Sequence, residues 1–215
     1  MGKLTRAVGV TVLVASAAFG AETAFGARAS VSSTSFSLFP NPAFLNCARK
    51  NAQTTPTAKA TVTRGSLNDT LTLKLNGFKP NIGFDLFTVQ RSNQLASGAP
   101  NPHFTTFGMA WYQSDIETSS TGSATVTIKT ILLDQIFGFD PDVSLAPTNT
   151  FHVGFWFDSP SLAQPCSTTT VAPTPFNGEH HAGPVAFITR PNSHTNLGPL
   201  CTAPVKKGST FVCKP

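Results

Sequence analysis

The clearest pattern in the chain is an alternation of apolar and polar residues with a period of two. It is cleanest over residues 70–75 and 124–129, where threonine or lysine occupies every second position. Successive side chains of a β-strand leave opposite faces, so this pattern predicts strands with one buried and one solvated face. The apolar positions of the two stretches are Leu71, Leu73, Leu75, Ala124, Val126 and Ile128.

Residues 104–130 predict two strands joined by a polar turn. Phe107, Met109 and Trp111 alternate along the first arm, and residues 124–130 form the second. Residues 118–122 between the arms are Thr, Ser, Ser, Thr and Gly, which favour a turn and bury no apolar side chain. We expect the two arms to pair with each other and the rest of the chain to be organised around them.

Several other segments have strand character and little in the chain favours helix. Residues 150–157 carry large apolar side chains on both faces, which predicts a central strand covered on both sides. About eight short strands predict an all-β fold, an antiparallel β-sandwich of the immunoglobulin-like or jelly-roll (Greek-key) type with long loops. The remaining expected strands are 60–64, 83–90, 184–189 and a possible edge strand at 33–39 that ends at Pro40.

Composition narrows the class of protein. Hydrophobic residues make up 40% of the 215 residues, but charged residues only 12%, which suits an exported β protein. The 18 phenylalanines suit a core, whereas sugar-binding platforms usually draw on Trp and Tyr. The net charge of +5 is spread thinly, with Arg49-Lys50 and Lys206-Lys207 as the only adjacent basic pairs. We therefore expect no nucleic-acid partner.

The N-terminus has the pattern of a secretory signal. Lys3 and Arg6 precede an apolar run at 7–20, and cleavage after Gly26 or Ala29 would follow small residues. The run is shorter than the roughly 20 residues that a membrane span needs, and no second apolar segment is long enough. We expect a secreted, extracellular protein without a membrane span after the signal is removed.

This pattern gives four parts to the chain. We expect a signal peptide at 1–29, an N-terminal extension at 30–59, a β-sandwich domain at 60–200 and a C-terminal tail at 201–215. No internal repeat divides the mature part.

The four cysteines all follow the signal. An even number of cysteines in an exported chain favours two disulfides, and their spacing matches no zinc motif. Three pairings are possible, and we favour Cys47 with Cys166 and Cys201 with Cys213. The first would tie an N-terminal segment to the loop after the central strand, and the second would close a short tail loop.

The histidines are the first candidates for a metal site. Glu179, His180 and His181 lie in a segment bounded by glycine and proline, which a metal ion could reach. Neighbouring histidines of a strand point to opposite sides, so shared coordination there needs a loop. A third ligand could come from His103, His152 or His194, although His152 fits a hydrogen-bonded core residue better. The sequence has no HExxH motif, and we expect neither a metal nor another cofactor.

Carboxylates are the second candidates for chemistry. Asp115 and Glu117 are two residues apart and would share one face of a strand. Asp134, Asp140 and Asp142 lie in a long loop where calcium could bind, although Pro141 makes a turn the simpler explanation. No nucleophile motif, phosphate-binding loop or dinucleotide motif is present, so we assign no catalytic residue.

The order of residues 75–87 and 115–128 resembles exported bacterial β-sandwich proteins. It runs Leu75-Asn76-Gly77-Phe78-Lys79-Pro80, Gly83-Phe84-Asp85-Leu86-Phe87 and Gly122-Ser123-Ala124-Thr125-Val126. It is also similar to the sandwich of Cu/Zn superoxide dismutase. That family carries a His-x-His copper pair where this chain has residues 84–87, so the resemblance implies no activity and no site residue.

Two hypotheses of function follow. The first is an exported, non-catalytic β-sandwich protein that acts through surface binding to the cell envelope, a matrix or a ligand. The second is a secreted hydrolase or metal-dependent enzyme that uses Glu179, His180 and His181, or the loop with Asp140 and Asp142.

Overall fold

The computed structural model describes residues 33–65, 69–130, 148–174, 176, 181–201, 204–207 and 210–213. The expected signal peptide lies outside these residues. In the described part, helix is confined to α1 (Leu45–Ala48), α2 (Pro160–Ala163) and the short 3-10 turn η1 (Gln164–Cys166). The expected all-β character is therefore confirmed.

The described strands cover most of the expected segments. Residues 150–157 form a strand in which all eight residues are buried, as expected of a central strand. The strands are β1 (Ser33–Pro40), β2 (Thr57–Thr63), β3 (Asp69–Asn76), β4 (Gly83–Val89), β5 (Ala110–Glu117), β6 (Ala124–Thr130), β7 (Thr150–Phe157), β8 (Val185–Ile188), β9 (Leu200–Cys201), β10 (Pro204–Lys207) and β11 (Thr210–Cys213).

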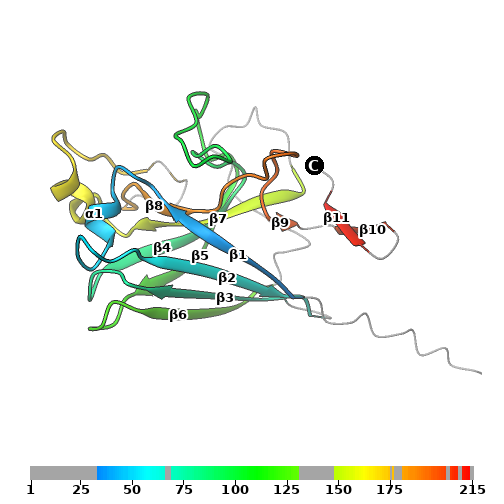
Figure 1. The fold of residues 1–215 in the computed structure, drawn as a ribbon, viewed down its shortest axis with the longest axis horizontal. Helices are drawn as coiled ribbons and strands as arrows, with labels where there is room; N and C mark the ends of the chain where they lie inside the picture. Colours follow the sequence, from blue (N-terminus) through cyan, green and yellow to red (C-terminus); the bar gives the residue numbers. More distant parts are fainter. Residues whose placement is uncertain are drawn as a thin grey trace, which may run out of the picture. The chain divides into compact units, whose positions relative to one another are not determined.

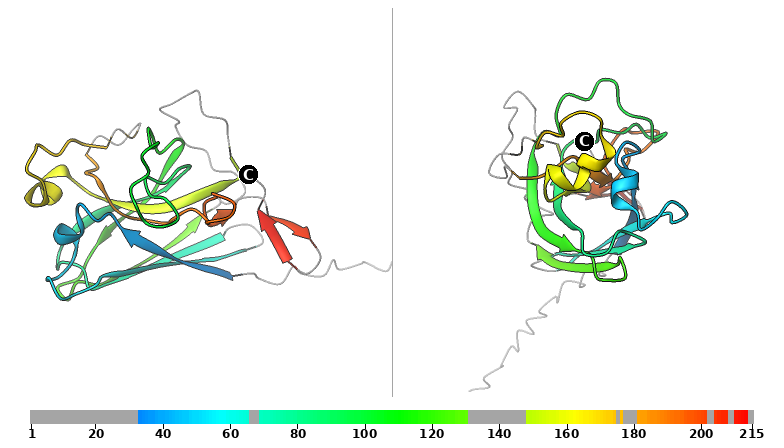
Figure 2. Two further views of the ribbon diagram at one scale, coloured as in Figure 1. Left: turned by 45° about the horizontal axis from the view of Figure 1, so that its top comes forward. Right: turned by 90° about the vertical axis from the view of Figure 1, so that its left-hand side faces the viewer.

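Nine of these strands form one curved antiparallel sheet (Figures 1 and 2). Its order is β5-β4-β7-β8-β1-β2-β3-β6, with β9 attached to the start of β7, and β10 pairs with β11 separately. The edge strands β5 and β6 follow each other in the chain, so the sheet curls back on itself and is nearly closed and barrel-like. A division into two sandwiched sheets is not confirmed.

The expected pairing of the two arms of 104–130 is wrong. Both strands exist, but β5 pairs with β4, and β6 pairs with β3. The first strand also begins only at Ala110, so Phe107 lies before it. The prediction correctly identified the turn at 118–122 but not the strands that the two arms join.

Hydrogen bonds between two turns explain this difference. The backbone N–H of Phe78 donates to the Gly122 carbonyl at 3.0 Å, and that of Asn81 donates to the Thr118 carbonyl at 3.0 Å. The turn between β5 and β6 therefore stacks on the turn between β3 and β4, and each arm continues beside the nearer strand. Gly122, at φ +82°, allows this approach, because an added Cβ would lie 2.0 Å from the Phe78 carbonyl oxygen.

The possible edge strand at 33–39 is also a correction, because β1 lies inside the sheet. Residues 33–38 pair with β2, whereas Phe39 and Pro40 pair with β8. β1 therefore joins two differently packed parts of the sheet. Within the expected N-terminal extension at 30–59, the described residues contribute β1, α1 and the start of β2.

The two parts differ in how their faces are covered. In the uncovered half (β1, β2, β3 and β6), one face packs on the core and the other carries Ser, Thr and Lys. In the covered half (β4, β7 and β8), nearly every residue is buried. Its second face carries a separate aromatic cluster, in which Phe87 and Trp156 pack against Phe107 and Phe176 from the loops.

A disulfide links two short helical segments that are distant in the sequence and adjacent in space (Figure 1). Cys47 of α1 bonds Cys166 at the end of η1, with Cα atoms 5.9 Å apart, so the expected pairing of these two cysteines is confirmed. The side chain of Cys213 lies outside the described residues, and its pairing with Cys201 stays a prediction.

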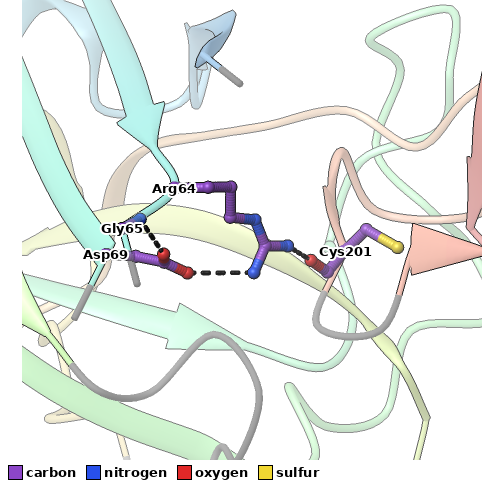
Figure 3. A network of polar contacts seen from close by, with 4 residues as sticks. All are labelled: Arg64, Gly65, Asp69 and Cys201. Atoms are coloured by element: carbon purple, nitrogen blue, oxygen red, sulfur yellow. Dashed lines mark hydrogen bonds and ion pairs between the residues drawn. The ribbon is translucent and has the colours of Figure 1, made fainter. Parts of the chain in front are cut away.

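A polar network fastens the end of β2 to the last strand of the sheet (Figure 3). Arg64 forms an ion pair with Asp69 at 2.9 Å, and the Asp69 carboxylate also accepts from the backbone N–H of Gly65. The same guanidinium donates to the carbonyl oxygen of Cys201 in β9. The Asp69 side chain is nearly buried, so the network satisfies a charge that would otherwise be costly.

Candidate ligand cavity beside His152

A polar cavity of about 620 Å³ lies at the start of β7. Its walls come from two loops, residues 90–105 after β4 and residues 191–198 after β8. Figure 1 shows both loops, green and orange, near the start of β7. Phe151 and Val153 point into the main core, so the alternation along β7 places His152 on the opposite face, beneath the loops.

Buried polar side chains form the inner wall of this cavity. Ser92 Oγ donates to the Thr189 carbonyl at 3.0 Å, and Gln94 Nε2 donates to the Pro40 carbonyl at 2.8 Å. Both residues are buried, so these bonds replace the water that the groups lose. The wall is therefore tied to the ends of β1 and β8.

Arg190 holds the wall residue Gln94 in place. Its Nε donates to Gln94 Oε1 at 3.2 Å, and its guanidinium carbon lies 3.9 Å from the centre of the Phe39 ring. Gly98, at φ +89°, lies against the same guanidinium, and an added Cβ there would be 2.3 Å from Arg190 Nη2. The loop after β4 is thus fitted closely to the end of β8.

His152 is the titratable group at the floor. Only 3% of its surface is exposed, and Nδ1 lies 3.0 Å from both the carbonyl oxygen and Oγ1 of Thr189. A carbonyl oxygen only accepts, which assigns the proton of the neutral ring to Nδ1. Burial lowers the pKa of His152 from 6.5 to about 4, and the hydrogen bond to Thr189 offsets part of this effect.

The ring therefore presents a hydrogen-bond acceptor at neutral pH. With Nδ1 held by Thr189, Nε2 carries a lone pair and has no partner among the described residues. Thr148, Thr150 and Phe104 line the same space. Such a lining can hydrogen-bond a polar molecule and pack against its apolar part.

The structure places the candidate histidines in different surroundings. His103 and His152 line the same cavity, with His103 exposed at its rim. The expectation that His152 is a hydrogen-bonded core residue is confirmed. His181 and His194 are exposed, while Glu179 and His180 lie outside the described residues.

The carboxylate candidates are not brought to the cavity. Asp115 and Glu117 share the exposed face of β5, as expected, and Asp115 accepts a hydrogen bond from the Tyr112 hydroxyl at 2.5 Å. Asp134, Asp140 and Asp142 lie outside the described residues. Across the described ranges, no group of three or more His, Cys, Asp and Glu side chains is placed to hold a metal ion.

Sequence reasoning missed most of the inner wall. Gln90, Ser92 and Gln94 follow β4 in a stretch that has the composition of an ordinary loop, and Thr189 ends a short apolar strand. The sequence holds one weak indication of their burial: these polar residues directly follow the apolar segments that form β4 and β8.

Comparisons of the chain with protein-family models, with curated proteins and with solved structures gave no match. In the part of the chain that the structure describes, no helix has the length and apolar character to cross a membrane.

Proposed function

We propose that this chain is an exported, non-catalytic binding protein that holds a small, uncharged, hydroxyl-bearing ligand in the cavity beside His152. The observation that carries the proposal is the buried imidazole of His152, which lines the cavity and is held at Nδ1 by Thr189, so that Nε2 is left as its hydrogen-bond acceptor. A ligand hydroxyl is a natural donor to this nitrogen.

The charges around the cavity support an uncharged ligand. The residues that line it include no carboxylate that would hold a cation. Its cationic side chain, Arg91, is exposed, and the buried His152 stays neutral above pH 5 because its pKa is about 4. A volume of about 620 Å³ lies within the usual range of small-molecule sites.

Export is supported by the N-terminal pattern and by the disulfide. A basic start followed by a short apolar run is typical of a secretory signal, and a disulfide persists in an oxidising compartment. Binding, rather than catalysis, is supported by the Ser92 hydroxyl, which donates to a backbone carbonyl instead of to a base.

Two substitutions of His152 test the proposal with a panel of neutral monosaccharides, disaccharides and polyols. In His152→Asn, the amide nitrogen can replace Nδ1 and keep the bond to Thr189, but the acceptor at Nε2 is lost. In His152→Gln, the longer side chain can restore an acceptor near that position. Calorimetric titration should find a ligand for the native chain, a loss of about tenfold or more in the Asn variant, and partial recovery in the Gln variant.

Either of two results would overturn it. One is that no member of the panel binds the native chain at millimolar concentration. The other is that the Asn variant, folded with an unchanged melting profile at pH 8, binds the ligand as tightly as the native chain.

A further inference from the structure

Three basic residues from two distant segments meet at a hollow on the surface. The adjacent pair Arg49 and Lys50 follows α1, and Lys79 lies in the turn after β3. Together with the polar residues Asn46 and Asn51, they line a hollow of about 380 Å³. Ordinary solubility does not require cations separated by about 30 positions in the sequence to converge.

Backbone hydrogen bonds fix the two segments against each other. The N–H of Lys50 donates to the Gly77 carbonyl at 2.9 Å, and the N–H of Lys79 donates to the Ala48 carbonyl at 2.8 Å. Arg49 and Phe78 form a β-bridge between these bonds. The disulfide at Cys47 anchors α1 just before the pair, so the backbone of the hollow is held by contacts within the protein.

No described residue neutralises the positive charge of the hollow. No carboxylate lines it, and neither Lys50 nor Lys79 forms an ion pair with a described residue. The Arg49 guanidinium donates to the Ala52 carbonyl at 2.9 Å, which orients it without cancelling its charge. Three uncompensated cations around one concave surface raise the local potential and attract an anion.

The outer face of the uncovered half extends this positive surface. Lys59 and Lys74 are directly opposite each other on β2 and β3, an arrangement of like charges that destabilises a sheet. The pair lies two positions along the strands from Thr57 and Asn76, where β3 reaches the turn of the hollow. The outward positions of the four strands carry no acidic residue: Ser33, Ser35, Ser37, Thr57, Lys59, Thr61, Thr63, Thr70, Thr72, Lys74, Asn76, Thr125, Thr127 and Lys129.

We propose that the hollow binds a phosphate group of a linear polyphosphate chain and that Lys59 and Lys74 bind the phosphates that follow it. Guanidinium and ammonium groups are the usual protein partners of phosphate oxygens. A polymer fits better than a free ion, because single exposed ion pairs are weak and screened, whereas several phosphates released from their counterions add up. This site is separate from the cavity beside His152 and does not depend on the function proposed for it.

The test compares two variants that remove the same charge. Lys50→Gln/Lys79→Gln changes the hollow, and Lys206→Gln/Lys207→Gln removes the other adjacent basic pair as a matched control. Binding of linear polyphosphate, measured by calorimetry at low salt, should weaken about tenfold in the first variant and less than about twofold in the control. Melting temperatures of both variants check that each is folded.

A second variant separates the hollow from the basic track, which is the pair Lys59 and Lys74 on the outer face of the uncovered half. Lys59→Gln/Lys74→Gln should weaken polyphosphate binding several-fold while the melting temperature stays constant or rises, because the opposed charges are gone. Binding of inorganic phosphate should be unaffected by this variant.

Three results would overturn the proposal. One is that the native chain does not bind polyphosphate even at low salt. Another is that the control variant loses as much affinity as the hollow variant, because the loss would then follow from net charge alone and not from the hollow. Single-stranded DNA of equal charge could bind more tightly than polyphosphate, which would point to base contacts instead.

Discussion

The two halves of the sheet differ in how many of their faces are buried: one face in the uncovered half and both faces in the covered half. In the uncovered half, the leucines of β3 face the core and its threonines and lysine face solvent, so one layer of packing is enough. In the covered half, β7 is buried on both faces, and the loops after β4 and β8 supply the second layer. The cavity beside His152 lies under those loops, whereas the uncovered half presents only its surface.

The coverage of each half determines which kind of ligand recognition it can support. A ligand can be enclosed only where loops cover a face of the sheet, as they do in the covered half. The solvent-exposed face of the uncovered half has no such loops and therefore no enclosed site. The exposed face of the uncovered half can bind a partner only through the lysine and hydroxyl groups at alternate positions of its strands. The polar cavity and the basic track accordingly belong to different halves.

The largest effect is expected from removing the disulfide that links α1, between two strands of the uncovered half, to η1, which follows β7 of the covered half. Cys47→Ser/Cys166→Ser opens a link between residues 119 apart. In the chain-entropy model, a loop of this length contributes about 5 kcal/mol to the free energy of unfolding. Denaturant unfolding of the variant and the native chain should show a loss of this order, and a loss below about 1 kcal/mol would contradict it.

The second test compares one core residue of the covered half with one exposed residue of the uncovered half. Phe155 lies 5.0 Å from the ring of Phe84 and stacks on Phe187 at 5.3 Å. Phe155→Ala should lower the free energy of unfolding by about 3–5 kcal/mol through the cavity that it leaves. Thr127→Val keeps a β-branched side chain on the exposed face, and should change it by less than about 0.5 kcal/mol. Similar losses in the two variants would show that the halves do not differ as described.

The third test uses pH, which should act on the covered half through His152. Its pKa is about 4 in the folded chain and 6.5 in the unfolded chain, so unfolding takes up a proton between these values. The stabilisation is complete above pH 6.5 and is lost as the pH falls to 4, about 3 kcal/mol in all.

Urea unfolding at several pH values measures this slope, and His152→Asn should flatten it. Arg91 and His103 are the other basic side chains that line the cavity, and both are exposed. An equal slope in the variant and the native chain would assign the pH dependence to other groups.

The smallest expected effect is that of a chelator. We expect the melting temperature to change by less than about 1 °C after treatment with EDTA, because the proposed function needs no metal. Stoichiometric zinc or copper that is lost together with several degrees of stability would contradict this. It would favour a metal-dependent enzyme built on Glu179, His180 and His181 or on Asp140 and Asp142.

The strands could be predicted from the sequence, but their partners could not. The alternation over residues 70–75 depends only on which face is buried, and the structure confirms it. The partners of β5 and β6 depend on hydrogen bonds between the Phe78 and Gly122 backbones, which are 44 residues apart and leave no local pattern. The Cys47–Cys166 pairing was within reach because only three pairings exist for four cysteines.

The candidate site was predictable only in its central residue. His152 lies in a strand with apolar neighbours, which indicated a hydrogen-bonded core histidine. Ser92 and Gln94 are buried only because the loop after β4 folds back toward Pro40 and Arg190. Their sequence neighbours are those of an exposed loop, so burial was not visible in them.

The link between α1 and η1 also decides how the molecule carries mechanical load. If the two ends of the polypeptide chain are pulled apart, the tension passes from Cys47 to Cys166 through the disulfide. The residues between these two cysteines then carry none of the tension along the backbone. Strands β2 to β7 lie within that bypassed stretch, while β1 and β8 lie outside it. A chain tethered at one end and pulled at the other would keep most of its sheet relaxed.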